Sequence, residues 1–221
     1  MNDWSIKKLV ICEADDFMDR PDRSGLNYLL YWKHKYLNFK ITLFTIPHRT
    51  NKSFLDFIGF PNDWVELAVH GWDHESNFEC YGWDEAETKM LMNSITYPPY
   101  TKIFKAPGWT IRPGHGGYPA APEDPINADP QGIYKGLRDL DFIVVDRHED
   151  RDFRPPNTKI ICIDDNPDII HMHTWRMNTP NPDERNGFEQ VEMRGTPWDN
   201  DTTFFTIGEA WQKGLIKPCQ E

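Results

Sequence analysis

The sequence lacks a basic stretch, and it lacks any apolar run near the length of about 20 residues that a membrane-spanning helix needs. Its formal net charge is −11, which argues against nucleic acid or an anionic membrane surface as a partner. The segment 1–5 is polar, and the first apolar run is short and ends in acidic residues, so no signal peptide is indicated. We therefore expect a cytoplasmic protein.

Cysteine is also scarce, and its spacing does not indicate a metal site. The four cysteines are Cys12, Cys80, Cys162 and Cys219, and none of them forms a Cys-x-x-Cys pair. Cys12 and Cys162 lie in apolar runs typical of strands. We expect these two to be buried free thiols.

The remaining composition is that of a globular protein. Charged residues make up 27% and aromatic residues 14% of the 221 residues. Length suits one domain, and neither repeats nor a linker divide the chain, so we expect residues 1–221 to form a single domain. The nine tryptophans and eight tyrosines could stack on sugar rings, and ordinary packing explains them equally well.

Short apolar runs alternate with segments of helical periodicity, which predicts an α/β fold with a mostly parallel sheet or barrel. The seven expected strands are 8–12, 39–46, 66–70, 102–105, 142–145, 159–163 and 168–172. The expected helices are 25–36, 52–58, 83–95, 133–140 and 203–213. The segment 110–132 is rich in proline and glycine, and so long a loop is usually functional or mobile.

Polar groups follow most of the predicted strands. In folds of this class, ligands gather at the carboxyl ends of the strands. The groups at those ends are Asp15, Asp16, His48, His70, His74, Lys105 to Trp109, Asp146 and His173. We expect them to converge on one rim, with His48 more typical of a loop residue.

His70 and His74 are four positions apart, which places both on one face of a helical turn. Two imidazoles and one carboxylate make a three-ligand zinc site with an open position for water. A second carboxylate can act as general base, a separate histidine can protonate the leaving group, and a backbone N–H can stabilise the oxyanion. Together these groups predict a metal-dependent hydrolase of an amide or ester.

These motifs, in this order, resemble the polysaccharide deacetylase family, which includes chitin and peptidoglycan deacetylases. The resemblance spans residues 8–175. It rests on Asp15-Asp16, the pair His70 and His74, the segment Phe104 to Trp109, Asp146, and His171-Met172-His173.

The resemblance implies a distorted (β/α) barrel and a role for each matched residue. Asp15 would be the general base and His173 the general acid. One divalent ion, Zn²⁺ before Co²⁺, Ni²⁺ or Fe²⁺, would be held by Asp16, His70 and His74. Lys105 and Asp146 would form a supporting ion pair. The substrate would contact Pro107, Gly108 through its N–H, Trp109 and Trp175.

Three positions depart from the family pattern. Lys105 replaces an arginine and loses the planar fork that grips a carboxylate. Gly71 stands where serine or threonine is usual, and His171 replaces a large aliphatic residue. Because residues 171 and 173 of a strand share a side, His171 competes with His173 for the acid role. The pattern looks like a less studied branch of the family.

We therefore expect a metal-dependent deacetylase that acts on an N-acetylated sugar or a related amide. Two alternatives stay open: a metal-dependent amidohydrolase on a small non-sugar amide, and a barrel that has lost catalysis and binds glycan through its aromatic residues. Neither nucleic acid nor membrane is expected as a partner. The sequence makes no prediction of an oligomeric state.

Overall fold

The computed structural model describes residues 9–18, 24–76, 79–96, 99–109, 111, 129, 131–147, 154–173, 198 and 201–219. These residues fall into two compact units. The first comprises 1–45, 49–67 and 167–215, and the second 46–48, 68–166 and 216–221. Of the sequence predictions, Trp175 and nearly all of the loop 110–132 lie outside the described residues.

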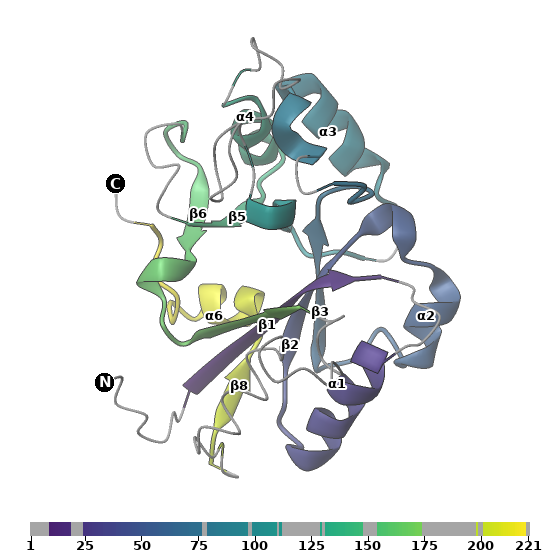
Figure 1. The fold of residues 1–221 in the computed structure, drawn as a ribbon. Helices are drawn as coiled ribbons and strands as arrows, with labels where there is room; N and C mark the ends of the chain where they lie inside the picture. The colour runs from purple at the N-terminus through teal and green to yellow at the C-terminus, as the bar shows by residue number, and fades with distance from the viewer. Residues whose placement is uncertain are drawn as a thin grey trace. The chain divides into compact units, whose positions relative to one another are not determined.

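The first unit is organised around β1 (Leu9–Phe17), the long purple strand of Figure 1. All of its side chains except that of Leu9 are buried. It pairs in parallel with β2 (Ile41–Thr45), β7 (Ile169–His173) and β8 (Thr203–Phe205). A strand buried on both faces needs an apolar run rather than an alternating pattern, and Leu9 to Cys12 supplies one.

Among the described residues, the first unit contains the helices α1 (Ser24–Lys35), α2 (Lys52–Phe57) and α6 (Ile207–Gln212). Helix α1 buries Leu29 and Trp32, which are spaced to lie on one helical face. The ring of Trp32 packs edge-on against Trp198, with centroids 5.4 Å apart, and Trp198 contacts Phe204 at 5.2 Å. These tryptophans therefore serve packing.

The second unit continues the parallel pairing. Strand β3 (Val65–His70) begins in the first unit and ends in the second, where it pairs with β4 (Ile103–Lys105). Strand β4 pairs with β5 (Ile143–Asp146), and β5 pairs with β6 (Lys159–Cys162). Helices α3 (Glu85–Ser94) and α4 (Gly132–Asp139) connect these strands. The short 3-10 turns are η1 (Pro47–Arg49), η2 (Glu79–Gly82), η3 (Pro107–Trp109) and η5 (Ile163–Asp165).

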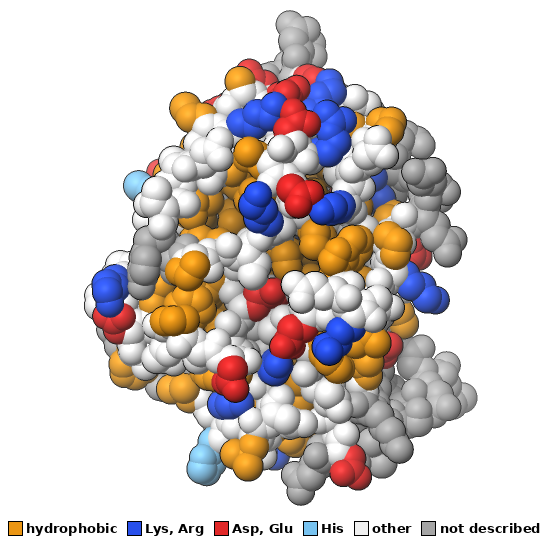
Figure 2. Space-filling model, turned by 180° about the vertical axis from the view of Figure 1, so that it is seen from behind, with side chains coloured by type: hydrophobic (Ala, Val, Ile, Leu, Met, Phe, Trp, Pro, Cys, Tyr) orange, Lys and Arg blue, Asp and Glu red, His pale blue; other side chains and the backbone are white. Residues whose placement is uncertain are grey.

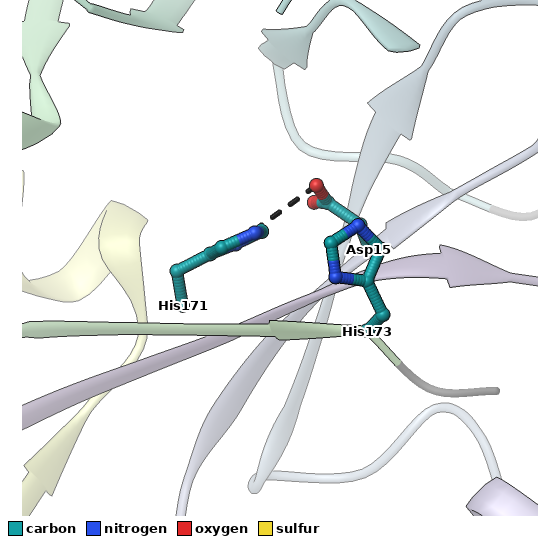
Figure 3. Close-up of side chains that lie close together, drawn as sticks. All are labelled: Asp15, His171 and His173. Atoms are coloured by element: carbon teal, nitrogen blue, oxygen red, sulfur yellow. Dashed lines mark ion pairs between the residues drawn. The ribbon is translucent and has the colours of Figure 1, made fainter. Parts of the chain in front are cut away.

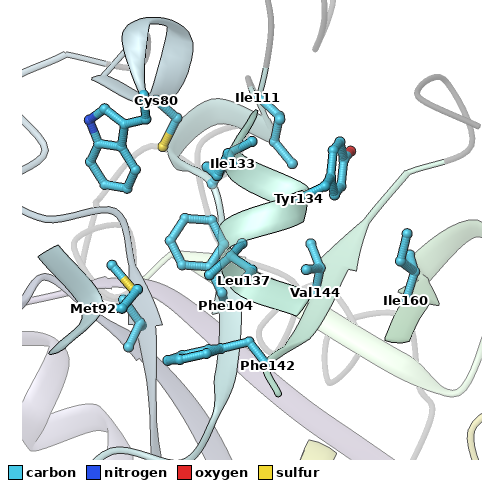
Figure 4. Packing of buried hydrophobic residues seen from close by; sticks show 13 residues of the cluster. Cys80, Met92, Phe104, Ile111, Ile133, Tyr134, Leu137, Phe142, Val144 and Ile160 are labelled. Carbon is cyan, nitrogen blue, oxygen red and sulfur yellow. The ribbon is translucent and has the colours of Figure 1, made fainter. Parts of the chain in front are cut away.

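Helices α3 and α4 pack closely over an apolar cluster (Figure 4). A Cβ at Gly136 of α4 would lie 2.7 Å from Cβ of Thr88 on α3, so only glycine permits this approach. The cluster includes the buried Phe104, Tyr134 and Leu137. Helix α3 starts at its cap Asp84, whose side chain accepts from the N–H of Glu87 at 2.8 Å.

The parallel strands with helices between them confirm the predicted α/β class and fit a distorted (β/α) barrel. One element was predicted wrongly. The helix expected over 203–213 begins only at Ile207, and Thr203–Phe205 is the strand β8, which gives eight strands among the described residues instead of the expected seven. Thr206 and Glu209 form a capping box that starts the helix there. The signal was therefore present in the sequence.

Acidic and basic side chains are interspersed on the face shown in Figure 2. Independently of that view, the ammonium of Lys89 on α3 lies 2.6 Å from the carboxylate of Glu85 and 2.5 Å from that of Asp139 on α4. Within the described part of the chain, none of the helices combines the length and the hydropathy that crossing a membrane requires.

Candidate active site

The predicted site residues fall into two groups, one in each unit. Asp15, Asp16, His171 and His173 lie in the first unit, at the ends of β1 and β7. The second unit contains His70, His74, Lys105, Pro107, Gly108, Trp109 and Asp146.

The ladder between β1 and β7 aligns acidic residues with histidines. Glu13 lies opposite His171, and Asp15 lies opposite His173. Asp15 and Asp16 are buried, and Asp16 has a positive φ of 62°, which turns the chain away from the regular strand. Strand β1 thus runs five residues beyond the predicted 8–12 and includes both predicted aspartates.

His171 is the centre of this group (Figure 3). Its Nδ1 lies 2.7 Å from Oε1 of Glu13 and 3.9 Å from Oδ2 of Asp15. The rings of His171 and His173 are 4.9 Å apart, and Nε2 of His173 lies 4.0 Å from Oδ2 of Asp16. The expectation that residues 171 and 173 share a side is confirmed.

The group at the ends of β1 and β7 has donor atoms for a metal ion, and a buried glutamate lies beside it. One ligand atom from each of Asp15, His171 and His173 lies within 4.8 Å of the others, so these three could hold a metal ion. Glu13 is a functional candidate that the sequence analysis missed, because it follows the apolar run Leu9 to Cys12 and matches none of the motifs. Its side chain is fully buried, and the imidazole of His171 is its partner.

His70 and His74 come together by a different route from the predicted one. His70 ends strand β3, Gly71 has a φ of 66°, and His74 has a φ of 51°, so no helical turn joins them. The helical explanation of their spacing is therefore wrong. Their rings are nevertheless 5.3 Å apart in an edge-on arrangement, because the positive-φ residues fold the segment back.

Glu79 holds this segment in place, and the sequence analysis did not single it out. Its carboxylate accepts from the backbone N–H groups of Trp72 at 2.5 Å, Asp73 at 3.0 Å and His74 at 2.9 Å. Burial raises the pKa of Glu79, and these three N–H groups oppose that rise. The loop geometry that positions His74 thus depends on one carboxylate five residues further along the chain.

Gly71 is explained by the same contact. A Cβ at this position would collide with Oε2 of Glu79 and would lie 2.8 Å from Cγ of Pro107. The space that a serine or threonine side chain would need is filled by the carboxylate that organises the loop. The departure from the family pattern at Gly71 is therefore coupled to Glu79.

The backbone and the side chain of Lys105 each contact another predicted site residue. Its backbone oxygen lies 3.0 Å from Nδ1 of His70, and this contact orients the ring so that Nε2 remains for a ligand role. Its fully buried side chain places the ammonium 4.1 Å from the ring centroid of Trp109, a cation–π contact. Trp109 is half-buried, and both Gly108 and Trp109 have positive φ values, of 59° and 61°.

Asp146 is buried at the end of β5 and is held by several donors. The hydroxyl of Tyr134 donates to Oδ2, the N–H of Arg147 donates to Oδ1 at 2.8 Å, and the guanidinium of Arg154 lies 3.5 Å from Oδ2. Arg154 was not considered in the sequence analysis. Burial lowers its pKa, but the charges of Asp146 and Tyr134 together with Cys219 leave it raised overall. His48, on η1, is exposed.

Of the comparisons with known proteins, that with solved structures gives matches. No protein-family model matches the chain, and no curated protein matches it. Among solved structures, a protein described as "T48 deacetylase with substrate" is similar, with 14% identity and a TM-score of 0.46. The match covers 99% of this chain and 98% of that chain. At this level of similarity, no residue role is transferred.

Proposed function

We propose that the protein is a metal-dependent hydrolase that removes an acetyl group from an N-acetylated sugar or a related amide. The observation that carries this proposal is the ladder between β1 and β7, which aligns the buried carboxylate of Asp15 with His173. A carboxylate and an imidazole at adjacent strand ends are the two proton-transfer groups that amide hydrolysis needs. Asp15 takes a proton from the attacking water, and His173 protonates the leaving amine.

Asp16, His70 and His74 would hold the metal ion, most readily Zn²⁺, with Co²⁺, Ni²⁺ or Fe²⁺ as alternatives. The donors suit such an ion, because the contact of Nδ1 of His70 with the Lys105 oxygen leaves Nε2 for coordination. The carboxylate of Glu79 accepts a hydrogen bond from the N–H of His74 and so fixes the backbone that carries the second imidazole. A bound ion would supply Lewis-acid polarisation of the amide carbonyl.

The remaining predicted residues bind and orient the substrate in this proposal. The N–H of Gly108 stabilises the developing oxyanion, and Pro107, Trp109 and Trp175 contact the substrate. Lys105 and Asp146 support the base electrostatically. The cation–π contact of Lys105 favours a role in orienting Trp109 as well.

The metal assignment is tested by elemental analysis of protein purified without chelator or metal resin. The parent, His70→Ala and His173→Ala should be compared after identical loading with Zn²⁺. We expect His70→Ala to bind one equivalent less than the parent and His173→Ala to bind as much as the parent. The reverse pattern would move the ion to the group of Asp15, His171 and His173.

The base assignment is tested by Asp15→Asn. We expect turnover to fall by about 10²- to 10⁴-fold while metal content is unchanged, because the amide cannot accept the proton. Release of acetate should be measured from N-acetylglucosamine oligomers and from small N-acetyl amides, which separates the sugar and small-amide alternatives. Full activity in Asp15→Asn would refute the role of Asp15, and glycan binding without acetate release by the parent would favour the non-catalytic alternative.

A further inference from the structure

A second cluster of metal-ligating side chains lies in the second unit, among residues that the proposed function does not use. It consists of Cys162 at the end of β6, Asp165 on η5 and Cys219 in the C-terminal segment. One ligand atom of each residue lies within 4.8 Å of the others. Cys162 is buried, whereas Asp165 and Cys219 are half-buried, so an ion can reach the cluster from solvent.

The C-terminal segment is fixed beside β6 by contacts that involve none of these three side chains. The backbone N–H of Cys219 donates to the oxygen of Ile160 at 2.9 Å. The side chain of Asn166 donates to the oxygens of Cys162 at 2.7 Å and Lys217 at 3.1 Å, and accepts from the N–H of Lys217 at 2.8 Å. The two sulfur atoms are therefore brought together before any ion binds.

Hydrogen-bond donors lie at both sulfur atoms. Burial raises the pKa of the Cys162 thiol, and the backbone N–H groups of Asp164 and Asp165 at its sulfur oppose that rise. Nη1 of Arg154 donates to Sγ of Cys219 at 2.7 Å. Donors directed at the sulfur of a cysteine are typical of metal-bound thiolates, which they hold in orientation and partly neutralise. By contrast, Cys80 is buried in the apolar cluster of Figure 4.

We propose that Cys162, Asp165 and Cys219 bind a thiophilic divalent cation such as Zn²⁺. Two thiolates and one carboxylate exceed the charge of the ion by one, and the guanidinium of Arg154 offsets that excess. Three protein ligands leave a fourth tetrahedral position for water. The bound ion links the C-terminal segment to β6, so we expect it to raise the melting temperature of the protein.

This site is independent of the proposed function, because Asp16, His70 and His74 offer no sulfur ligand. Co²⁺ distinguishes the two, since only a thiolate ligand produces an intense near-ultraviolet charge-transfer band. The full chain should be stripped of metal, reduced and titrated with Co²⁺ alone. We expect the band in the parent and in His70→Ala.

Because Cys162 remains, Cys219→Ser should bind Co²⁺ at least about 100-fold more weakly at this site and show no band at Co²⁺ concentrations that saturate the parent, and Asp165→Asn should weaken binding about 10- to 100-fold. Cys80→Ser is the matched control, because it removes a thiol outside the cluster and should keep the band. Circular dichroism and a thiol count confirm that each variant is folded and reduced. A band that persists in Cys219→Ser, or no band in a parent with four titratable thiols, would overturn the proposal. Oxidation of Cys162 and Cys219 to a disulfide that Zn²⁺ does not prevent would overturn it as well.

Discussion

Gly71 shows how one residue without a side chain can determine the geometry of a candidate ligand. Its positive φ turns the chain after β3, and the space beside it is filled by Glu79 and Pro107. The carboxylate of Glu79 then binds three consecutive N–H groups that end at His74. The position of His74 is therefore set by residues on both sides of it.

The steric part of this constraint can be separated from the backbone part. Gly59 has a φ of 69°, and a methyl group added there would meet open space, so Gly59→Ala should cost only the left-handed strain of about 1–2 kcal/mol. Gly71→Ala should cost that amount and a further ~1–3 kcal/mol for the overlap with Glu79 and Pro107. Urea unfolding of both variants measures the difference. Equal losses would show that the loop relaxes around the added methyl group.

The pairing of β1 with β7 includes a buried glutamate, Glu13, directly after the apolar half of β1. Glu13 is fully buried, and His171 lies directly across the ladder, with its Nδ1 2.7 Å from Oε1 of Glu13. A buried carboxylate destabilises the fold unless it is hydrogen-bonded, so the pair is expected to act as a unit. It also places His171 beside Asp15.

A double-mutant cycle tests this unit. His171→Leu removes the imidazole partner of a buried carboxylate, and we expect a loss of about 3–5 kcal/mol in the free energy of unfolding. Glu13→Leu combined with His171→Leu should recover a large part of that loss, because both polar groups are then replaced by apolar ones. Chemical denaturation of the parent, both single variants and the double variant gives the coupling energy. Additive losses would mean that the two side chains do not depend on each other.

The net charge of −11 leads us to expect that the whole molecule is more stable at mildly acidic pH than at neutral pH. The side chain of Glu66 contributes to this pH dependence. Its carboxylate accepts from the hydroxyl of Thr42 at 2.7 Å and from the N–H of Gly208 at 3.0 Å, and so joins β2, β3 and α6 within the first unit. Burial raises the pKa of Glu66 above its ordinary value, although these hydrogen bonds oppose the rise.

The sign of the pH effect follows from linkage. Below the unfolded-state pKa of about 4.3, both states are protonated at this position. As pH rises from there through the raised folded-state pKa, the native state binds more protons than the unfolded state, so the contribution of Glu66 to stability declines. The free energy of unfolding of the parent relative to Glu66→Gln should therefore fall across this window and then level off. Urea unfolding at a series of pH values measures it, and a difference that does not vary with pH would contradict the assignment.

The alternation of apolar runs and periodic segments was enough to predict the α/β class and most elements, because strands buried on both faces of a parallel sheet are mostly apolar. The capping box of Thr206 shows that the start of α6, which was predicted at the wrong residue, is nevertheless encoded in the local sequence. The side-by-side placement of residues 171 and 173 was likewise predictable from the period of a strand.

Other features depend on residues that are distant in sequence or on the direction of the backbone. Glu13 meets His171 only through the register of β1 and β7, and Cys162 meets Cys219 only because the C-terminal segment pairs with β6. Positive φ values, rather than the expected helical turn, bring His70 and His74 together. The spacing of residues along the chain does not predict these contacts. Local propensity depends on each residue and its neighbours in sequence, whereas these contacts depend on how the folded elements pack.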